Sequence, residues 1–355
     1  MANMVDAFSS DVFDVVQTTA AINELDWVPG RAGTLAFEGV GEGVATTSVT
    51  IESLPEGLKL IPTSLRGAPA PVETKDKRSM LKLDIPFIQL TDSIFADSIQ
   101  NVRAFGSNEL ESADSVINKQ MEKMNLRLDL TLEHHRLGAL RGVIKDADGS
   151  TLCDLFSEFG FLNSDGIAAA EEFEFSLDNY GAVGVGNAIR IQCQAVKRYM
   201  KRQAKTNIPA NAKIWAFCGD NFFDKLLEHP SVRSTYDGYG AAQAALGGNY
   251  TFDIFEYGGV FWENYQGTDD NSTVIIAPDE CRFFLSGVPG LYVEYYAPAD
   301  FIPQANTIGL PRYASVQDDN NHGRSVSILV ESAPLPLCLR PQTLCRGVIA
   351  EAPSA

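Results

Sequence analysis

The sequence has no segment of the kind that directs a chain into or across a membrane. Residues 1–30 contain neither Lys nor Arg, and Asp6, Asp11 and Asp14 interrupt their apolar positions. A secretory signal needs a basic start followed by an uninterrupted apolar stretch. No apolar run reaches the roughly 18 residues that would indicate a transmembrane helix. We therefore expect no secretion signal and no membrane partner.

Cysteine and histidine are scarce, and their spacing fits no metal or redox site. The six cysteines are Cys153, Cys193, Cys218, Cys281, Cys338 and Cys345. They form no C-x-x-C pair, and without a secretion signal we expect buried, reduced thiols. His134 and His135 are adjacent, so on a helix they point about 100° apart and cannot share a metal as an i, i+4 pair does. We expect this pair to face solvent or an interface.

Catalytic motifs are also missing. The sequence holds neither a G-x-S-x-G nucleophile elbow nor an H-E-x-x-H zinc motif. Residues 39–43 read GVGEG, which superficially resembles a nucleotide loop, but a β-prone run follows where such a loop needs a helix. Residues 146–149 read DADG, like the start of a calcium loop, yet Ser157 stands where the loop's closing glutamate belongs. Turns explain both segments, and we assign no catalytic, cofactor-binding or metal-binding residue.

Positive charge is in the minority. The 28 basic side chains face 46 acidic ones, which leaves a formal net charge of −18. Such a surface repels nucleic acid on average, so any contact with a polyanion must come from a local basic patch. Hydrophobic residues make up 45% of the chain and charged residues 21%, which excludes wholesale disorder. A length of 355 residues predicts about two domains or one elaborate domain.

The residues that are present predict an α+β fold. The strongest helix covers 108–140, where apolar residues step by three and four. This stripe is Leu110, Ala113, Ile117, Met121, Met124, Leu128 and Leu132. Residues 34–39 and 44–52 predict a hairpin around glycine, and 143–155 predict another with an Asp-Gly turn. A short helix at 221–228 and further strands at 213–217, 251–263, 273–277, 291–296 and 326–330 complete the expected elements.

Residues 53–90 form a long excursion that contains five prolines and a weak apolar period. A segment of this composition is hard to bury in the core of its own domain, and it is typical of an element that lies on a neighbouring subunit. Its basic residues outnumber Glu73 and Asp76 between positions 66 and 82. They are Arg66, Lys75, Lys77, Arg78 and Lys82.

A second helix is predicted at 187–205, and its charge is unusual for so acidic a chain. Its apolar residues Ile189, Cys193, Val196 and Met200 should point inward. Six cations and no acid occupy its other positions. These cations are Arg190, Lys197, Arg198, Lys201, Arg202 and Lys205. Positions 197, 201 and 205 are four apart and share one face.

The carboxyl-terminal third carries the most specific sequence. Residues 285–301 read LSGVPGLYVEYYAPADF, residues 306–313 read NTIGLPRY, and residues 330–341 read VESAPLPLCLRP. In order and spacing these segments resemble the lambda-type major capsid proteins of tailed bacteriophages, the phage capsid E family. Leu140-Arg-Gly142 followed by 146–149 looks like the long helix of that family running into its hairpin. The resemblance extends over most of the chain from about residue 30.

The resemblance implies the tailed-phage major capsid fold. That fold has an N-terminal arm, an extended loop, a peripheral domain on a long spine helix, and an axial domain. On this chain it predicts an arm at 1–44, an extended β-hairpin loop at 45–90, a peripheral domain at 91–184 with spine helix 108–140, an axial domain at 185–310, and a return strand to the peripheral domain with the C-terminal tail at 311–355. The last strand is expected beside the hairpin at 143–155.

The resemblance also implies a function without enzymatic activity. Such a protein self-assembles into hexamers and pentamers that form the icosahedral head shell around the double-stranded DNA genome. It is assembled in the host cytoplasm and ends in the virion. Its expected partners are copies of itself, a scaffolding protein or segment, the portal, a decoration protein, and packaged DNA held by weak non-specific contact. A shell protein of a bacterial nanocompartment and a cytosolic acidic enzyme remain the alternatives.

Within this role the two basic segments become interface candidates. Arg66, Lys75, Lys77, Arg78 and Lys82 would steer the loop onto the next acidic subunit. The alternative for them is a solvated loop. Lys197, Arg198, Lys201, Arg202 and Lys205 would face the capsid interior or an adjacent subunit. The alternative for these five is a solvated face whose charges pair with acids elsewhere on the subunit.

Overall fold

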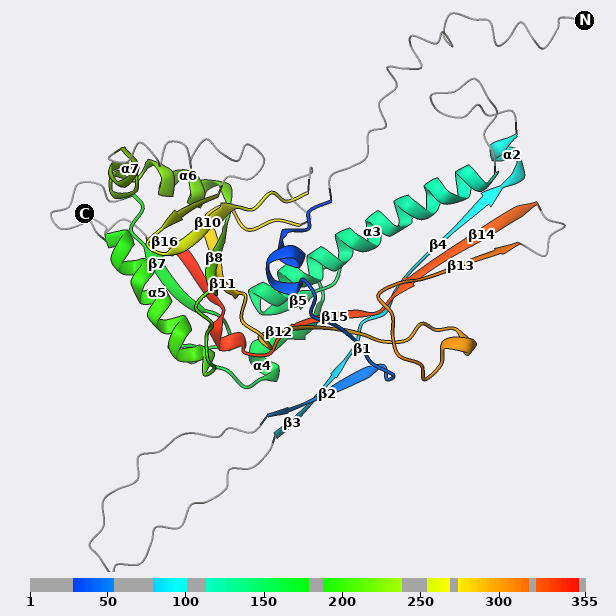
Figure 1. Cartoon of the computed structure of the whole chain (residues 1–355). Helices are drawn as coiled ribbons and strands as arrows, with labels where there is room; N and C mark the ends of the chain where they lie inside the picture. The colour runs from blue at the N-terminus through cyan, green and yellow to red at the C-terminus, as the bar shows by residue number, and fades with distance from the viewer. Residues whose placement is uncertain are drawn as a thin grey trace, which may run out of the picture.

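The computed structural model describes residues 28–53, 79–100, 113–178, 188–237, 254–268, 274–318 and 324–350. A six-stranded sheet, in the order β7-β16-β11-β8-β10-β9, forms the body at one end of the molecule (Figure 1). Its strands are β7 (Glu171–Phe175), β8 (Lys213–Cys218), β9 (Ile254–Tyr257), β10 (Val260–Asn264), β11 (Glu280–Ser286) and β16 (Cys345–Ile349). Three helices accompany the sheet: α5 (Ala188–Ala204), α6 (Asp220–Glu228) and α7 (Pro230–Asp237).

Aromatic packing holds this sheet to its helices. Every residue of β8 except the first is buried, as expected of a central strand covered on both faces. Phe222 of α6 packs against Phe175 of β7, with ring centroids 5.7 Å apart, and stacks on Trp262 of β10. The predicted inward stripe of α5 is confirmed, because Ile189, Cys193, Val196 and Met200 are all fully buried. Both predicted helices at 187–205 and 221–228 therefore exist where the apolar period placed them.

The long helix is α3 (Ala113–Arg141), which confirms the predicted helix from residue 113 onward. The first residues of the prediction, 108–112, lie outside the described residues. At about 1.5 Å per residue the helix is about 43 Å long, and it runs from the body out to the far end of the molecule (Figure 1). Its carboxyl-terminal half enters the main core, whereas Met124 and Leu128 belong to a separate small cluster.

That small cluster joins α3 to a three-stranded antiparallel sheet. The sheet order is β13-β14-β4, from β13 (Tyr313–Asp318), β14 (Ser325–Ser332) and β4 (Ile88–Phe95). Ile328 and Val330 of β14 are fully buried in the cluster with Met124 and Leu128. The late strand predicted at 326–330 is thus confirmed, but its predicted place beside the hairpin at 143–155 is wrong. Its apolar face is buried against the outer half of α3, which lies away from that hairpin.

The hairpin at 143–155 forms a two-stranded sheet of its own, from β5 (Val143–Lys145) and β6 (Thr151–Asp154). Its predicted turn is confirmed: Gly149 has φ of 86°, and the Asp148 carboxylate accepts a hydrogen bond from the Ser150 amide at 2.8 Å. Asp154 then caps the short helix α4 (Leu155–Glu158) by accepting from the amides of Phe156 and Ser157.

The hairpin predicted from 34–39 and 44–52 is wrong. Gly33–Phe37 instead form a π-helix, η3, and Gly41–Gly43 form β1, which pairs in parallel with β12 (Tyr292–Tyr296). β12 also pairs with β15 (Pro334–Cys338). Tertiary contacts override the local β tendency here: Phe37 is buried, and a side chain on Gly43 would lie 2.2 Å from the Gly309 carbonyl oxygen.

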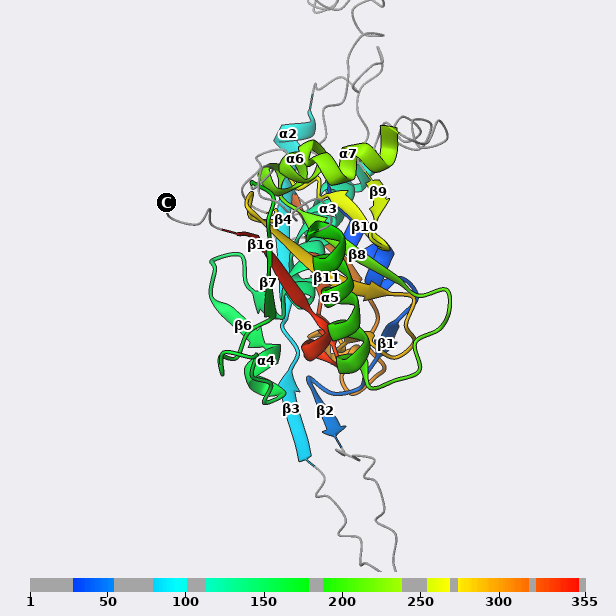
Figure 2. The same ribbon diagram turned by 90° about the vertical axis from the view of Figure 1, so that its left-hand side faces the viewer.

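The remaining run, β2 (Ser48–Ser53), pairs with β3 (Ser79–Asp84) in an antiparallel ladder that extends from the body (Figure 2). The predicted strand at 273–277 is wrong from residue 274 on, where the chain is irregular although Val274 and Ile276 are buried. The predicted strand at 291–296 is confirmed as β12. Three short helices complete the described chain: α2 (Ala96–Ile99), η5 (Ile302–Gln304) and η6 (Pro341–Thr343).

The six-stranded sheet crosses the boundary predicted at residues 184 and 185. β7 and β16 lie outside 185–310, yet they pair with one another and β16 pairs with β11. Sequence periodicity cannot show this, because strand order depends on contacts between distant segments. None of the described helices combines the length and the apolar composition that crossing a bilayer requires.

Candidate functional site

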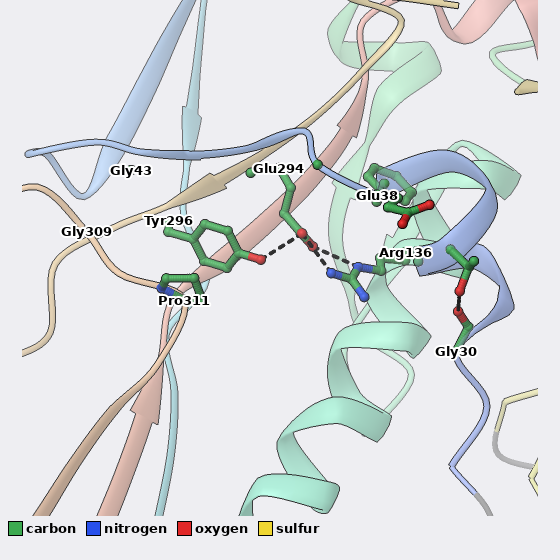
Figure 3. A pocket seen from close by; sticks show the side chains of 13 residues that line it. Gly30, Glu38, Gly43, Arg136, Glu294, Tyr296, Gly309 and Pro311 are labelled. Atoms are coloured by element: carbon green, nitrogen blue, oxygen red, sulfur yellow. Dashed lines mark hydrogen bonds and ion pairs between the residues drawn. The ribbon is translucent and has the colours of Figure 1, made fainter. Parts of the chain in front are cut away.

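A cavity of about 470 Å³ lies between η3, β1, α3 and β12 (Figure 3). Residues of η3, β1, α3 and β12 line it, together with Gly309 and Pro311. Several of its lining residues are glycines, which let the backbones of β1 and its neighbours approach closely. The cavity therefore lies along β1, before the chain enters the β2–β3 ladder.

A buried ion pair forms one wall of this cavity. The guanidinium of Arg136 on α3 donates two hydrogen bonds to the Glu294 carboxylate of β12, at 2.9 and 2.8 Å (Figure 3). Tyr296 donates a third from its hydroxyl at 2.7 Å. Burial is the largest single effect on Arg136 and lowers its pKa, but the hydrogen bonds and charge of Glu294, together with Tyr296 and Glu133, raise the pKa overall. The two hydrogen bonds join the long helix to the strand beside β1.

One helical turn before Arg136, Glu133 holds the segment that leads into β1. Its carboxylate accepts hydrogen bonds from the amides of Ala32 and Gly33 at 2.7 and 3.1 Å, and from the Tyr265 hydroxyl at 3.2 Å. Burial raises the pKa of Glu133 despite these bonds. Arg136, Glu294 and Glu133 are thus occupied in holding chain segments together. The arrangement suits a mechanical anchor rather than a catalytic site.

A second ion pair anchors the same segment to the large sheet. Arg31 donates to both oxygens of Glu263 on β10, at 2.6 and 2.8 Å, and Glu263 is fully buried. The guanidinium also lies 5.8 Å from the ring centroid of Trp215 on β8. Residues 31–33 are therefore hydrogen-bonded to both α3 and the six-stranded sheet, at the point in the chain that precedes β1 and the β2–β3 ladder.

The β2–β3 ladder carries one of the predicted interface residues, Lys82 of β3. Its ammonium nitrogen lies 3.9 Å from the Asp84 carboxylate, and both side chains are largely exposed. An exposed pair of this kind contributes little to stability. Arg66, Lys75, Lys77 and Arg78 lie outside the described residues. Near the outer end of the ladder Met80 is 68% exposed, which the sequence pattern did not predict.

The predicted basic face of α5 is present on the surface. Arg198, Lys201 and Arg202 are exposed, Lys197 is half-buried, and Lys205 lies exposed just after the helix with φ of 46°. Within the part of the chain that the structure describes, none of these five side chains forms an ion pair. The alternative in which they pair with acids of their own subunit thus finds no support among the described residues.

Exposed apolar side chains form a further surface that periodicity did not predict. Ile302, Ile308 and Leu310 lie between β12 and β13 and are 95%, 70% and 53% exposed. Phe95 at the end of β4 and Val316 of β13 are also exposed. If side chains such as Ile302, Ile308 and Leu310 lie together, they would form a contact surface rather than an ordinary solvent-facing loop. One indication of this surface was present in the sequence: residues 306–313 belong to the carboxyl-terminal segments that resemble phage capsid proteins.

The histidine and cysteine side chains considered as possible site residues are mostly buried. His135 is 1% exposed, so the expectation that His134 and His135 face solvent or an interface is wrong for this residue, because the end of α3 packs into the main core. Burial lowers the pKa of His135 to about 4, so the ring is neutral. All six cysteines are buried and free, as expected. Among the described residues no group of histidine, cysteine and carboxylate side chains could hold a metal ion.

Curated relatives of this chain are phage capsid proteins. The chain is 26% identical over 318 residues to the major capsid protein of Pseudomonas phage KPP10, covering 84% of this chain and 87% of that one. It is 27% identical over 308 residues to the major capsid protein of Salmonella phage Felix O1, covering 77% and 79% of the two chains.

Solved structures share the fold at low sequence identity. The capsid of Myoviridae phage XM1 matches with a TM-score of 0.54 and 10% identity over 99% of both chains. The capsid of a native GTA particle matches with a TM-score of 0.55 and 11% identity over 99% of this chain and 100% of the other. These matches confirm the predicted tailed-phage capsid fold. The model of the family described as phage major capsid protein E spans residues 14–349. The chain therefore belongs to the phage major capsid protein E family, and it is a structural protein of the icosahedral head shell of tailed phages, not an enzyme.

Proposed function

We propose that this chain assembles into hexamers and pentamers, and that these capsomers close around the double-stranded DNA genome in the host cytoplasm. The observation that carries the proposal is the β2–β3 ladder, which extends from the body as two isolated strands (Figures 1 and 2). A two-stranded ladder on its own is marginally stable in water. Among the described strands neither outer edge of this ladder is paired, so both edges can offer backbone groups to another chain.

The ladder is apolar where it leaves the body and exposed further out. Val49 and Leu83, which face one another across it, are buried in the main core. Toward the outer end, Met80 pairs with Glu52 and is largely exposed. In a shell, the neighbouring subunit would cover this exposed part. The basic residues Arg66, Lys75, Lys77, Arg78 and Lys82 would then guide the loop onto an acidic neighbour.

The domain roles follow from the same proposal. The arm is 1–44 and the extended loop 45–90, while α3 acts as the spine of a peripheral domain that includes the β13-β14-β4 sheet. The six-stranded sheet with α5 forms the axial domain near the capsomer centre, and it recruits β7 and β16 from outside 185–310. The ion pairs Arg136–Glu294 and Arg31–Glu263 would transmit load from the loop to both domains.

Further partners belong to the proposal as well. The exposed cations of α5 would engage an acidic scaffolding protein or segment and later, weakly, the packaged DNA. A portal at one vertex and a decoration protein on the outer surface are partners that the role implies. The exposed apolar residues Ile302, Ile308 and Leu310 would be covered by a second copy of the chain in the shell.

The test is deletion of residues 66–80, which removes the second part of the loop together with Ser79 and Met80, the outermost paired residues of β3. We expect a folded subunit that no longer forms closed shells, because the intersubunit element is gone. Circular dichroism would check folding, and electron microscopy with sedimentation would check assembly. The matched control replaces 66–80 by a Gly/Ser segment of equal length, which restores length but not side chains. Normal shells from the deletion variant would overturn the assignment of this loop.

A further inference from the structure

A second cavity of about 470 Å³ lies on the other side of α3 from the anchor described above. The end of α3, β5, β11 and residues 275–278 surround it. Its size is in the range of about 300–1,000 Å³ that is typical of sites for small ligands. Nothing in the assembly role accounts for this cavity.

Positive charge dominates its lining. Arg141, Lys145 and Arg282 contribute three cations, and among the described lining residues Glu280 is the single carboxylate. The lining therefore carries 3 − 1 = 2 net positive charges. On a chain with a formal charge of −18, a concave surface of this sign calls for an explanation.

Glu280 is already occupied by other partners. Arg282 donates two hydrogen bonds to its Oε1, at 3.1 and 2.9 Å, and Arg346 donates to its Oε2 at 2.6 Å. Arg346 also reaches Glu172 at 3.0 Å. Glu280 also attracts Arg141 through space, and the Asp146 carboxylate lies near His134. Among the described residues, however, neither Arg141 nor Lys145 forms an ion pair.

Arg141 is the residue that most needs a partner. Among the described residues its side chain forms no ion pair, and its Nε is buried with no hydrogen-bond partner. Burial, together with Arg282, lowers its pKa to about 10, so it is still a cation at neutral pH. Arg141 is only partly buried, but its buried Nε–H lacks an acceptor, and an anion in the cavity would supply one.

Two other groups are placed to complete a site. His134 lies on α3 about two turns before Arg141, lines the same cavity, and its Nε2 is buried without a hydrogen-bond partner. Burial lowers the pKa of His134, so its neutral ring can offer one N–H donor. Lys145 of β5 is exposed at the cavity and can move its ammonium group toward a ligand.

We propose that this cavity is a binding site for a phosphate-type oxyanion, held by Arg141 and Lys145 with His134 and Arg282 in support. A phosphate group carries about 1.5 to 2 negative charges near neutral pH and three strong acceptor oxygens, which matches the two net charges and several donors of the lining. A single carboxylate would balance only half of that charge. The planar fork of Arg141 suits bidentate binding of phosphate oxygens.

The experiment titrates the full-length unassembled subunit with inorganic phosphate and follows binding by calorimetry and by phosphorus NMR line width. We expect saturable binding of one phosphate per chain. Lys145→Met, at an exposed position that should not disturb folding, should weaken binding about threefold to tenfold, and Arg141→Gln should weaken it at least about tenfold. Lys123→Met on the exposed face of α3 removes the same charge about 27 Å from Arg141 and should leave the affinity unchanged.

A competition arm identifies the source of the phosphate. If a short single-stranded oligonucleotide displaces inorganic phosphate from the wild-type chain, backbone phosphates reach the site. If it does not, the site takes a free phosphate ion, and saturable binding supports the proposal in either case. Non-saturable binding, or binding that Lys145→Met and Lys123→Met weaken equally, would overturn it. Because the titration uses unassembled subunits, failure here would leave the proposed shell function standing.

Discussion

At the scale of single residues, buried polar groups in this chain divide into those with partners and those without. Glu294, Glu133 and Glu263 are almost inaccessible, and each one is fixed by two or more hydrogen bonds from distant segments. Such groups stabilise a fold only while both partners remain, since removal of one leaves a buried charge. The hydrogen bonds of these three glutamates fix the position of residues 31–43 on the body. Apolar packing alone would define that position less strictly.

His135 belongs to the other group. Both ring nitrogens are buried and have no hydrogen-bond partner among the described residues. Burial, followed by the neighbouring His134, lowers its folded-state pKa to about 4, against about 6.5 for an unperturbed histidine. The folded state therefore binds the proton of this ring less readily than the unfolded state does. The contribution of neutral His135 to stability is fully present above pH 6.5 and is lost as the pH falls toward 4.

We therefore predict that unassembled subunits lose stability between pH 6.5 and pH 4, by up to roughly 3 kcal/mol from this residue. His135→Leu removes the titrating ring, so its free energy of unfolding should fall less over the same range. Urea unfolding of both proteins at a series of pH values measures the difference. The comparison at pH 7.5, where the ring is neutral in both states, controls for altered packing. Parallel pH profiles for the two proteins would contradict the prediction.

At the scale of elements, the outer half of α3 depends on a small cluster. Met124 and Leu128 pack there with Ile94, Ile328 and Val330, away from the main core. A charge buried among these side chains would have neither water nor a partner. Because the cluster contains few residues, it cannot repack around a side chain of the wrong size or polarity.

Leu128→Asp is accordingly expected to abolish soluble subunit, whereas Leu128→Ala should cost about 2–5 kcal/mol of unfolding free energy and remain measurable. Yield of soluble protein and urea unfolding are the two measurements. Arg127→Asp, one residue earlier and exposed, introduces the same acid and should leave yield unchanged. Equal yields for Leu128→Asp and Arg127→Asp would show that the small cluster does not hold α3.

Local signals predicted the elements that depend on local contacts. The apolar stripe of α5, the long helix α3 and the Asp-Gly turn at 146–149 were readable because each signal lies within a few residues of its effect. The path of residues 33–43 was not readable, since β1 pairs with Glu294–Tyr296, about 250 positions later. The interaction of Glu133 with Ala32 was hidden for the same reason.

The candidate sites show the same limit. The basic residues at 197–205 were found because they form a run, and the structure keeps four of them on α5, with Lys205 just after its end. Arg141 looked like an ordinary cation at the end of a helix, where basic residues are favourable. Its lack of a partner depends on β5, β11 and residues 275–278 closing around it, which no spacing in the sequence records.

At the scale of the whole molecule, shape and charge act together. The body, the spine helix with its sheet, and the β2–β3 ladder point in different directions (Figure 1), so one subunit can reach several neighbours. Many weak contacts of this kind add up across a closed lattice. The charge of −18 keeps most of the surface from binding DNA, while the cations of α5 form a local exception.

The last prediction concerns that exception. Reversing charge at Lys197, Lys201 and Lys205 together, each to Glu, should reduce procapsid formation and genome retention, because an acidic scaffold and DNA phosphates would both be repelled. Binding of wild-type subunits to duplex DNA should weaken as the salt concentration rises. In a plot of log binding constant against log salt concentration, the variant's slope should be smaller by about 0.9 for each phosphate that it no longer binds.

The control reverses the same number of charges at Lys123, Arg127 and Arg233, which are exposed cations outside α5. Because both triple variants change net charge equally, a general repulsion between DNA and a more acidic subunit would affect them alike. A specific role of α5 requires that only its own variant lose particles and salt-dependent binding. If both triple variants lose particles and DNA binding equally, the effect depends only on total charge. The basic side chains of α5 would then be an ordinary solvated surface.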